Sequence, residues 1–221
     1  LFGDGAGMDL LRDIERCGRT CYKSEDKITN ESAMKFVKML ITKGHESVLE
    51  HGKVTVRVVC DRGVTHEIVR HRIASYSQES TRYCNYGNQG EITIILPVWY
   101  QEVHLNDKEQ GSKSSLYGSP LYWKYAAWRE ACYSSELHYL EMINLGATPD
   151  EARSVLPNSL KTEIVITFNL REWRHFFKLR TAAAAHPQMR EITVPMLEEF
   201  KGKIPVIFDD IEIGFIPFIP H

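Results

Sequence analysis

Two hydrophobic patterns meet in residues 160–180, which read LKTEIVITFNLREWRHFFKLR. Residues 160–170 alternate between apolar and polar side chains, and this two-residue period is typical of a β-strand. Residues 171–180 instead place their aromatic side chains at helical spacing. A strand that leads directly into an amphipathic helix indicates a fold that mixes both kinds of element.

The aromatic side chains of this expected helix predict which of its faces is buried. Trp173, Phe176 and Phe177 should face the protein core, and Leu179 is expected to join them. Arg180 follows this tightly apolar helix directly, so its side chain should begin from a half-buried position. An arginine held in this way differs from an ordinary surface charge.

The same patterns recur along the rest of the chain. Helical spacing predicts six further helices, over residues 9–21, 30–43, 62–72, 120–144, 148–157 and 187–202. Alternation predicts two further strands, over residues 53–60 and 91–98. Residues 105–120 are polar and rich in turn formers, which favours a mobile surface loop. We find no internal repeat, and a single mixed α+β domain over residues 1–221 fits this order best.

Capping residues predict where two of these helices begin. Asn30 or Ser32 is expected to cap the helix over residues 30–43. Thr148 is expected to cap the short helix that follows, with Pro149 in its first turn. Both predictions rest on side-chain oxygens that can accept the unpaired N–H groups of a first turn.

Composition excludes several classes of protein. The chain has 221 residues, 43% of them hydrophobic, and a net charge of −2, which argues against a nucleic-acid binder held by a basic face. It has no apolar run of about 18 residues, so we expect no membrane span. Its five cysteines are odd in number and follow no secretory signal, which disfavours a disulfide framework. We therefore expect a cytoplasmic protein.

A basic and hydroxyl-rich segment, RHRIASYSQESTRY, occupies residues 70–83. Cations at the end of a helix complement its dipole, and this simple explanation accounts for residues 70–72. It does not account for the serines, the threonine and the arginine that follow. Hydroxyl groups and backbone amides beside arginine side chains form sites for phosphate oxygens.

Two other functions remain open on the residues alone. A nucleotide- or RNA-binding module would use the same arginines and serines without chemistry. A metal-dependent hydrolase would use imidazole and carboxylate ligands, for which the sequence offers His45, Glu46, Glu50, His51, His66 and His71. His45 and His51 do not share a helical face, and no cysteine pair or HExxH motif accompanies them. No metal is therefore expected.

The segment also contains a longer pattern, Arg70-His71-Arg72 followed after seven residues by Ser80. This pattern resembles the signature of the flavin-dependent thymidylate synthases, the ThyX family. Residues 44–51 (GHESVLEH), 151–157 (EARSVLP) and 168–180 (FNLREWRHFFKLR) resemble other blocks of that family. The blocks stand in family order and span most of the chain.

The resemblance implies a fold, a reaction and an assembly. The fold would be α+β, with a central, largely antiparallel sheet flanked by helices. The reaction would convert dUMP to dTMP, with methylenetetrahydrofolate as carbon donor and with FAD that NADPH reduces. The family forms homotetramers that share active sites between subunits, and the apolar tail over residues 204–220 is compatible with burial at an interface or with an edge strand. No cysteine follows a proline, as the nucleophile of classical thymidylate synthases does, which supports the flavin route.

The resemblance also implies roles for individual residues. Flavin contacts are implied for Ser47, Arg70, His71, Arg72, Gln78, Asn169, Leu170, Arg171 and His175. Contacts to dUMP are implied for Glu67, Arg70, Gln78, Glu79, Ser80, Thr81, Arg82, Arg153 and Arg180. Arg180 stands where the family places the arginine that favours ionisation of uracil N3. Ser80 has no adjacent base to activate it, so we assign it to nucleotide binding rather than to nucleophilic attack.

Overall fold

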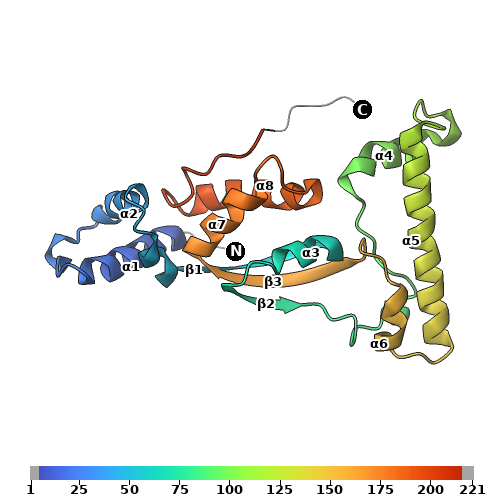
Figure 1. Ribbon diagram of the computed structural model, residues 1–221, viewed down its shortest axis with the longest axis horizontal. Coiled ribbons are helices and arrows are strands. Elements are labelled where there is room, and N and C mark those ends of the chain that lie inside the picture. Colours follow the sequence, from blue (N-terminus) through green and yellow to red (C-terminus); the bar gives the residue numbers. More distant parts are fainter. Residues whose placement is uncertain (1–4, 216–221) are drawn as a thin grey trace. The chain divides into compact units, whose positions relative to one another are not determined.

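The computed structural model of the protein describes residues 5–215. Its sheet contains strands β1 (Lys53–Asp61), β2 (Ala74–Gln78) and β3 (Lys161–Asn169). The strands are antiparallel, and β3 lies between β1 and β2 (Figure 1). A sheet of this kind among many helices confirms the predicted α+β class. No helix within residues 5–215 combines the length and the hydropathy that a membrane crossing needs.

The chain forms two compact units. The first unit contains residues 5–56, 71–76 and 165–215, and the second contains residues 57–70 and 77–164. Each strand therefore contributes residues to both units. The assignment of residues 1–221 to one domain stays a prediction.

The first unit is built from helices at both ends of the chain. Its helical segments are α1 (Ala6–Thr20), α2 (Ser32–Thr42), α7 (Leu170–Arg180) and α8 (Pro187–Lys203), with short 3-10 turns at Glu25–Lys27 and Glu46–His51. Helix α1 packs against α2, and α7 packs against α8 and the turn Glu46–His51. Trp173, Phe176 and Phe177 are fully buried, as predicted, and the Trp173 indole donates to the Val54 carbonyl at 3.1 Å. Leu179 is 49% exposed, so its predicted burial is wrong.

The chain beyond α8 folds back onto this core. Ile204, Ile207, Phe208 and Ile211 are all buried, and the Phe208 ring meets that of Phe177 edge-on at 5.6 Å. Residues 204–215 contain no strand, and although the four side chains above are buried, Ile213 and Phe215 are 36% and 84% exposed. The rest of the tail considered for an interface, residues 216–220, lies outside the described residues.

The second unit is organised around one long helix, α5 (Pro120–Asn144). Helix α4 (Gln101–Gln110) lies against its N-terminal half, and α6 (Pro149–Ala152) lies near its other end (Figure 1). The unit also contains α3 (Arg62–Ile68) and 3-10 turns at Tyr86–Gln89, Val98–Tyr100, Gly111–Lys113 and Arg153–Val155.

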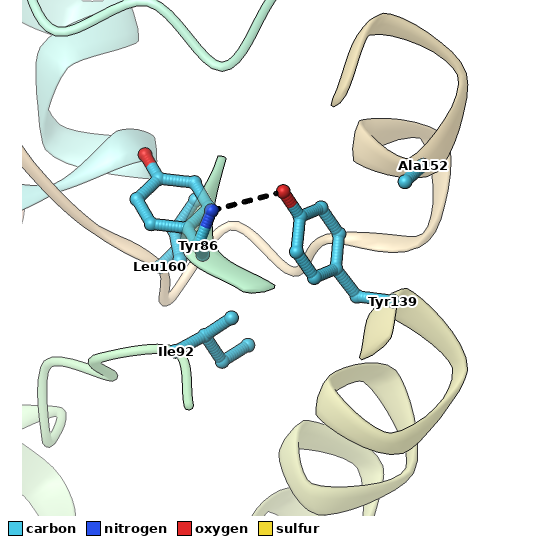
Figure 2. Packing of buried hydrophobic residues seen from close by; sticks show 5 residues of the cluster. All are labelled: Tyr86, Ile92, Tyr139, Ala152 and Leu160. Carbon is cyan, nitrogen blue, oxygen red and sulfur yellow. Dashed lines mark hydrogen bonds between the residues drawn. The ribbon is translucent and has the colours of Figure 1, made fainter. Parts of the chain in front are cut away.

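A small buried cluster joins α5 and α6 to the loop before them. It contains Tyr86, Ile92, Tyr139, Ala152 and Leu160, and Figure 2 shows these side chains directed toward one another. The Tyr139 hydroxyl accepts a hydrogen bond from the Tyr86 backbone N–H at 3.2 Å. The polar end of this buried ring is thereby satisfied, as burial of a phenol requires.

Two predictions about the strands and loops are wrong, and one strand was not predicted. Residues 91–98 form only an isolated bridge, between Ile94 and Leu160, because the Ile92 N–H is taken by the Glu136 carboxylate and Pro97 has no N–H to donate. Residues 74–78, for which the sequence predicted no regular element, form β2. Much of the expected loop over residues 105–120 is helical, since α4 extends to Gln110.

The helix ends agree with the sequence in one case and differ in two. Thr148 caps α6, and its pairing with Glu151 forms a complete capping box. The cap of α2 is Glu31 rather than Asn30 or Ser32. The predicted helix over residues 62–72 ends at Ile68, which leaves the basic triplet beyond the helix.

Candidate active site

One face of α7 carries a charged residue at each end and an aromatic residue between them. Glu172, Phe176 and Arg180 stand at four-residue intervals, which places them along a single stripe of the helix. Asn169 begins the helix, because its side-chain oxygen accepts the Glu172 backbone N–H at 2.8 Å. This cap fixes the first turn, from which the Glu172 side chain projects.

His71 lies on this stripe. Its ring meets the Phe176 ring edge-on at 4.9 Å, its Nδ1 is 2.9 Å from a Glu172 carboxylate oxygen, and its Nε2 accepts from Arg180 Nε at 3.2 Å. The imidazole is 5% exposed, although the two residues on either side of it are exposed. His71 therefore connects the first turn of α7 to its last residue.

The protonation of His71 follows from its partners. Burial lowers the pKa of the imidazole, the Glu172 hydrogen bond opposes that change, and the Arg180 charge adds to it. The ring is therefore neutral at pH 7. Arginine only donates, so Nε2 must carry the lone pair and Nδ1 the proton that Glu172 accepts.

Tyr76 holds the same histidine from β2. Its hydroxyl donates to the His71 backbone carbonyl at 2.5 Å. Burial, followed by the nearby Glu172 charge, raises the pKa of the Tyr76 hydroxyl to about 12, so it remains a donor across the physiological range. The backbone of His71 is thus held by β2, and its ring is held by α7.

A cavity of about 430 Å³ opens beside the first turn of α7. Glu50 pairs there with Arg171 at 2.6 Å, and both side chains are about half exposed. Arg174 is buried and pairs with Glu46 at 3.0 Å and with Asp210 at 2.6 Å. The cavity is lined by Glu46, Glu50, Ile73, Asn169, Arg171, Glu172, Arg174, His175 and Lys178. Amide, imidazole and cationic groups thus face the same space as three carboxylates.

A second group of predicted residues lies in the second unit. One carboxylate oxygen of Asp150 lies 3.3 Å from Arg82 Nε and 3.1 Å from Arg153 Nε, and all three side chains are substantially exposed. The two arginines converge on the same point, so an anion that replaced Asp150 would meet both.

Glu79 is held near the end of β2 by two neighbours. The Tyr86 hydroxyl donates to it at 2.6 Å, and Lys161 Nζ lies 3.2 Å from its other oxygen. Gln78 donates to the Thr65 hydroxyl at 3.0 Å, and the Ser80 hydroxyl accepts the Arg82 backbone N–H at 3.3 Å.

The predicted site residues divide evenly between the units. The first unit contains Ser47, His71, Arg72, Asn169, Leu170, Arg171, His175 and Arg180. The second contains Glu67, Arg70, Gln78, Glu79, Ser80, Thr81, Arg82 and Arg153. Asn169, Arg171 and His175 share the cavity, whereas Leu170 is fully buried and its N–H donates to the Gly52 carbonyl. Arg70 and Arg72 are exposed, and Arg180 is half-buried as expected.

Sequence reasoning missed three residues that organise these groups. Glu172 and Tyr76 fix His71, and Asp150 joins Arg82 to Arg153. The spacing of Glu172 and Arg180 along one helical face was a usable signal. The role of Asp150 was visible only in part, since it stands three residues before Arg153.

Five of the ligands considered from the sequence, His45, Glu46, Glu50, His51 and His66, belong to no metal-binding group among the described residues. Within the described part of the chain, the one group with suitable ligand atoms is His71, Glu172 and His175, whose atoms lie within 4.8 Å of one another. Its His71 Nε2 lone pair accepts from Arg180, and a guanidinium charge at that position disfavours a bound cation.

Two of the cysteines, Cys60 and Cys132, lack the setting of a nucleophile. Burial, followed by the Asp61 charge, raises the pKa of the Cys60 thiol to about 12, and burial raises that of Cys132 as well. Cys21 is exposed, and Cys17 and Cys84 are partly exposed.

Comparison with known proteins finds similarity over most of the chain. A family model described as thymidylate synthase complementing protein matches residues 8–206. A flavin-dependent thymidylate synthase of Pyrococcus furiosus is 36% identical over 188 residues, which cover 84% of this chain and 70% of that protein.

Two further relatives carry the same name. The protein of Pyrococcus abyssi is 36% identical over 179 residues, covering 80% of this chain and 66% of its own length. That of Geobacter sulfurreducens is 33% identical over 204 residues, covering 89% of this chain and 80% of its own length. The chain belongs to the family of flavin-dependent thymidylate synthases.

Proposed function

We propose that this protein converts dUMP to dTMP, with methylenetetrahydrofolate as carbon donor and with FAD that NADPH reduces. Membership of the family supports the reaction and the flavin. The observation that carries the proposal is the cavity beside α7, because three residues expected to contact flavin, Asn169, Arg171 and His175, line it together.

The residues around this cavity fit a flavin dinucleotide. Arg171 and Lys178 supply cations for a diphosphate, and Asn169 and His175 supply hydrogen-bonding groups. Glu50 balances Arg171 through an exposed ion pair, and such pairs are weak enough for a phosphate to displace. When bound, FAD would supply the reducing equivalents of the reaction.

The chain's own residues would bind and polarise the nucleotide. Arg82 and Arg153 already converge on the Asp150 carboxylate, and we assign them to an anionic part of dUMP. Arg180, always protonated, would stabilise negative charge that develops on the uracil ring. Its Nε is already oriented by His71, which restricts the plane of the guanidinium before substrate arrives.

The proposal includes a cytoplasmic homotetramer whose subunits share active sites. Helix α5 supports self-association, because it exposes Trp123, Tyr133 and Leu137 at 58%, 59% and 47% of their surfaces. Large apolar side chains exposed along one element are typical of interfaces.

The test is a reconstitution. Protein incubated with excess FAD should become yellow after desalting, and with NADPH and methylenetetrahydrofolate it should convert dUMP to dTMP. Protein that takes up no flavin would contradict the proposal. Protein that binds dUMP but releases no dTMP would instead be a nucleotide-binding module, and an activity that depends on added zinc would indicate a hydrolase.

A further inference from the structure

The contacts of His71 suggest a role for a carboxylate that the proposed function leaves without one. Glu172 is 7% exposed, and one of its oxygens lies 2.9 Å from His71 Nδ1. It occupies the first turn of α7, where the helix dipole favours negative charge. A buried carboxylate that binds a single buried imidazole requires an explanation.

The donor and the acceptor of the two hydrogen bonds that link Glu172, His71 and Arg180 follow from the protons that each group carries. Arg180 donates from Nε, so His71 Nε2 must accept. A neutral imidazole with a lone pair on Nε2 has its proton on Nδ1, and Glu172 accepts that proton's hydrogen bond. Glu172 and Arg180 therefore both favour the His71 tautomer that has its proton on Nδ1.

The packing leaves the imidazole little freedom to turn. Phe176 meets it edge-on at 4.9 Å, His175 lies 5.6 Å away, and Tyr76 holds its backbone carbonyl. Without an acceptor at Nδ1, a buried N–H would lose its partner, at a cost comparable to that of a lost hydrogen bond. If the His71 ring then rotated, or moved its proton to Nε2, it would present a donor to Arg180 Nε, which is itself a donor.

We propose that Glu172 is a positioning residue for Arg180, and that it acts through His71 by keeping Nε2 available as the acceptor for Arg180 Nε. This inference rests on the proposed function, in which Arg180 polarises the uracil ring. In this role Glu172 acts through His71 and not through its own place in the lining of the cavity. Its effect should appear in turnover rather than in nucleotide affinity.

A matched pair of Glu172 variants distinguishes loss of the hydrogen bond to His71 from a change in the size of the side chain. Glu172→Gln keeps an acceptor oxygen in a side chain of the same length, whereas Glu172→Met keeps the length but removes the acceptor. Glu15→Gln serves as the control, because Glu15 is a carboxylate of the same unit that is 1% exposed and binds Arg19 and Ser32. Each variant is loaded with FAD, and turnover is divided by bound flavin.

We expect Glu172→Met to lower turnover at saturating dUMP by about tenfold or more, as loss of an outer partner of a functional histidine does. Glu172→Gln should retain most of the turnover, and Glu15→Gln should retain all of it. KM for dUMP should change little in each. Equal losses in the two Glu172 variants, or loss of flavin with unchanged turnover per bound flavin, would overturn the inference.

The pH profile provides a readout that general destabilisation would not shift. Protonation of His71 places a proton on Nε2 toward Arg180, so turnover should fall as the pH falls through the lowered pKa of His71. The charged and titratable groups facing this ring are Glu172, Arg180, His175 and Tyr76. Glu172→Gln removes an influence that raises this pKa, so its acid limb should move to lower pH. An unmoved limb would contradict the inference.

The tautomer can be measured without any activity. Nitrogen-15 NMR of histidine-labelled protein, with His71 assigned from a His71→Gln spectrum, should place the proton on Nδ1 at pH 7. A proton on Nε2 would overturn the inference. A wild-type protein that has this tautomer and binds FAD, yet forms no dTMP, would instead show that the proposed function fails.

Discussion

At the scale of single residues, three of the arginines assigned to ligands are already paired with carboxylates. Asp150 lies between Arg82 and Arg153, and Glu50 pairs with Arg171. These pairs are exposed, so each contributes little to stability. Their value is that they hold the guanidinium groups in place until an anion with more oxygens replaces the carboxylate.

The sequence singled out His71 and Arg180 as candidates, whereas it did not indicate that Glu172 contacts His71. Arg180 follows an apolar helix, and His71 stands in a motif with a specific spacing to Ser80. The contact between Glu172 and His71 joins residues 101 positions apart, and no local pattern encodes such a pairing. A sequence reading sees the helical face of Glu172 but not the ring that packs on it.

The first prediction concerns Arg180 and Arg153. Arg180→Ala should lower turnover on the order of a hundredfold or more, because it removes charge that acts mainly in the transition state. Arg180→Lys should restore only part of the turnover, since an ammonium lacks the planar fork. Arg153→Ala should mainly raise the dUMP concentration needed, because its contact is equal in the ground and transition states.

Steady-state conversion of dUMP to dTMP, with flavin occupancy checked for each variant, provides the measurement. Lys35→Ala, an exposed change on α2, is the control for purification and assay. Normal turnover of Arg180→Ala at saturating dUMP, together with an inactive Arg153→Ala, would show that the two roles are reversed or wrong.

At the scale of elements, helices were predicted better than strands. The helices over residues 120–144, 171–180 and 187–202 agree with α5, α7 and α8 closely, and α5 and α8 each begin at a proline, which is favoured in a first turn. Residues 74–78 have no such local signal: their sequence, ASYSQ, is mostly polar, and pairing with β3 is what makes them a strand. Strand formation depends on neighbours that a local window does not contain.

Helix α4, in contrast, is a helix that its local sequence does not predict. Its sequence, QEVHLNDKEQ, is polar enough to be read as a loop, and only Val103 in it is buried among the apolar residues. The helix is supported by α5, since the Tyr125 hydroxyl hydrogen-bonds to His104 and Arg129 pairs with Asp107. Packing against a neighbouring helix overrides the weak local pattern.

The second prediction concerns the capping box of α6. Thr148→Ala should lower the free energy of unfolding by about 1 kcal/mol, the usual cost of a lost threonine cap. Thr148 accepts the Glu151 backbone N–H at 3.3 Å, and Glu151 accepts the Thr148 N–H at 2.7 Å. Urea unfolding should reveal the loss, and Thr42→Ala, whose hydroxyl only bonds back within α2, should not share it.

The same cap predicts a pH dependence. Hydrogen bonds from Thr148 lower the pKa of Glu151, so its contribution is complete above the unfolded pKa and is lost as the pH falls through the folded value. The stability difference between wild type and Glu151→Gln should therefore be largest near neutral pH and should shrink in acid. A difference that grows as the pH falls would contradict this assignment.

At the scale of the whole molecule, the first unit is assembled from distant parts of the chain. Residues 5–56 and 165–215 are separated by more than a hundred residues, and they meet where the buried Trp173 indole donates to the Val54 carbonyl. Local patterns predict which faces are apolar, but they do not predict which distant faces meet. This is why the helices of this unit were expected and their grouping was not.

Arg174 shows how the last part of the chain is attached to this core. The side chain is 2% exposed and pairs with Glu46 and with Asp210, and it also donates to the Ile207 carbonyl. A buried guanidinium is stable only while its partners remain, because an unpaired buried charge is costly. Asp210 and Ile207 belong to the segment after α8, so this one arginine joins that segment to α7.

The third prediction follows from that attachment. Asp210→Asn should lower the free energy of unfolding at pH 7 on the order of 2 kcal/mol, since it removes the charged acceptor from a buried arginine. Arg174 lowers the pKa of Asp210 by hydrogen bonding, so the carboxylate contributes fully above its unfolded pKa and loses this contribution as the pH falls through the folded value. Wild type and Asp210→Asn should therefore converge in acid. Urea unfolding at pH 7 and pH 3 measures both values, with exposed Asp209→Asn as the control. Equal differences at the two pH values, or an equal loss in the control, would mean that Arg174 does not depend on Asp210 for its burial.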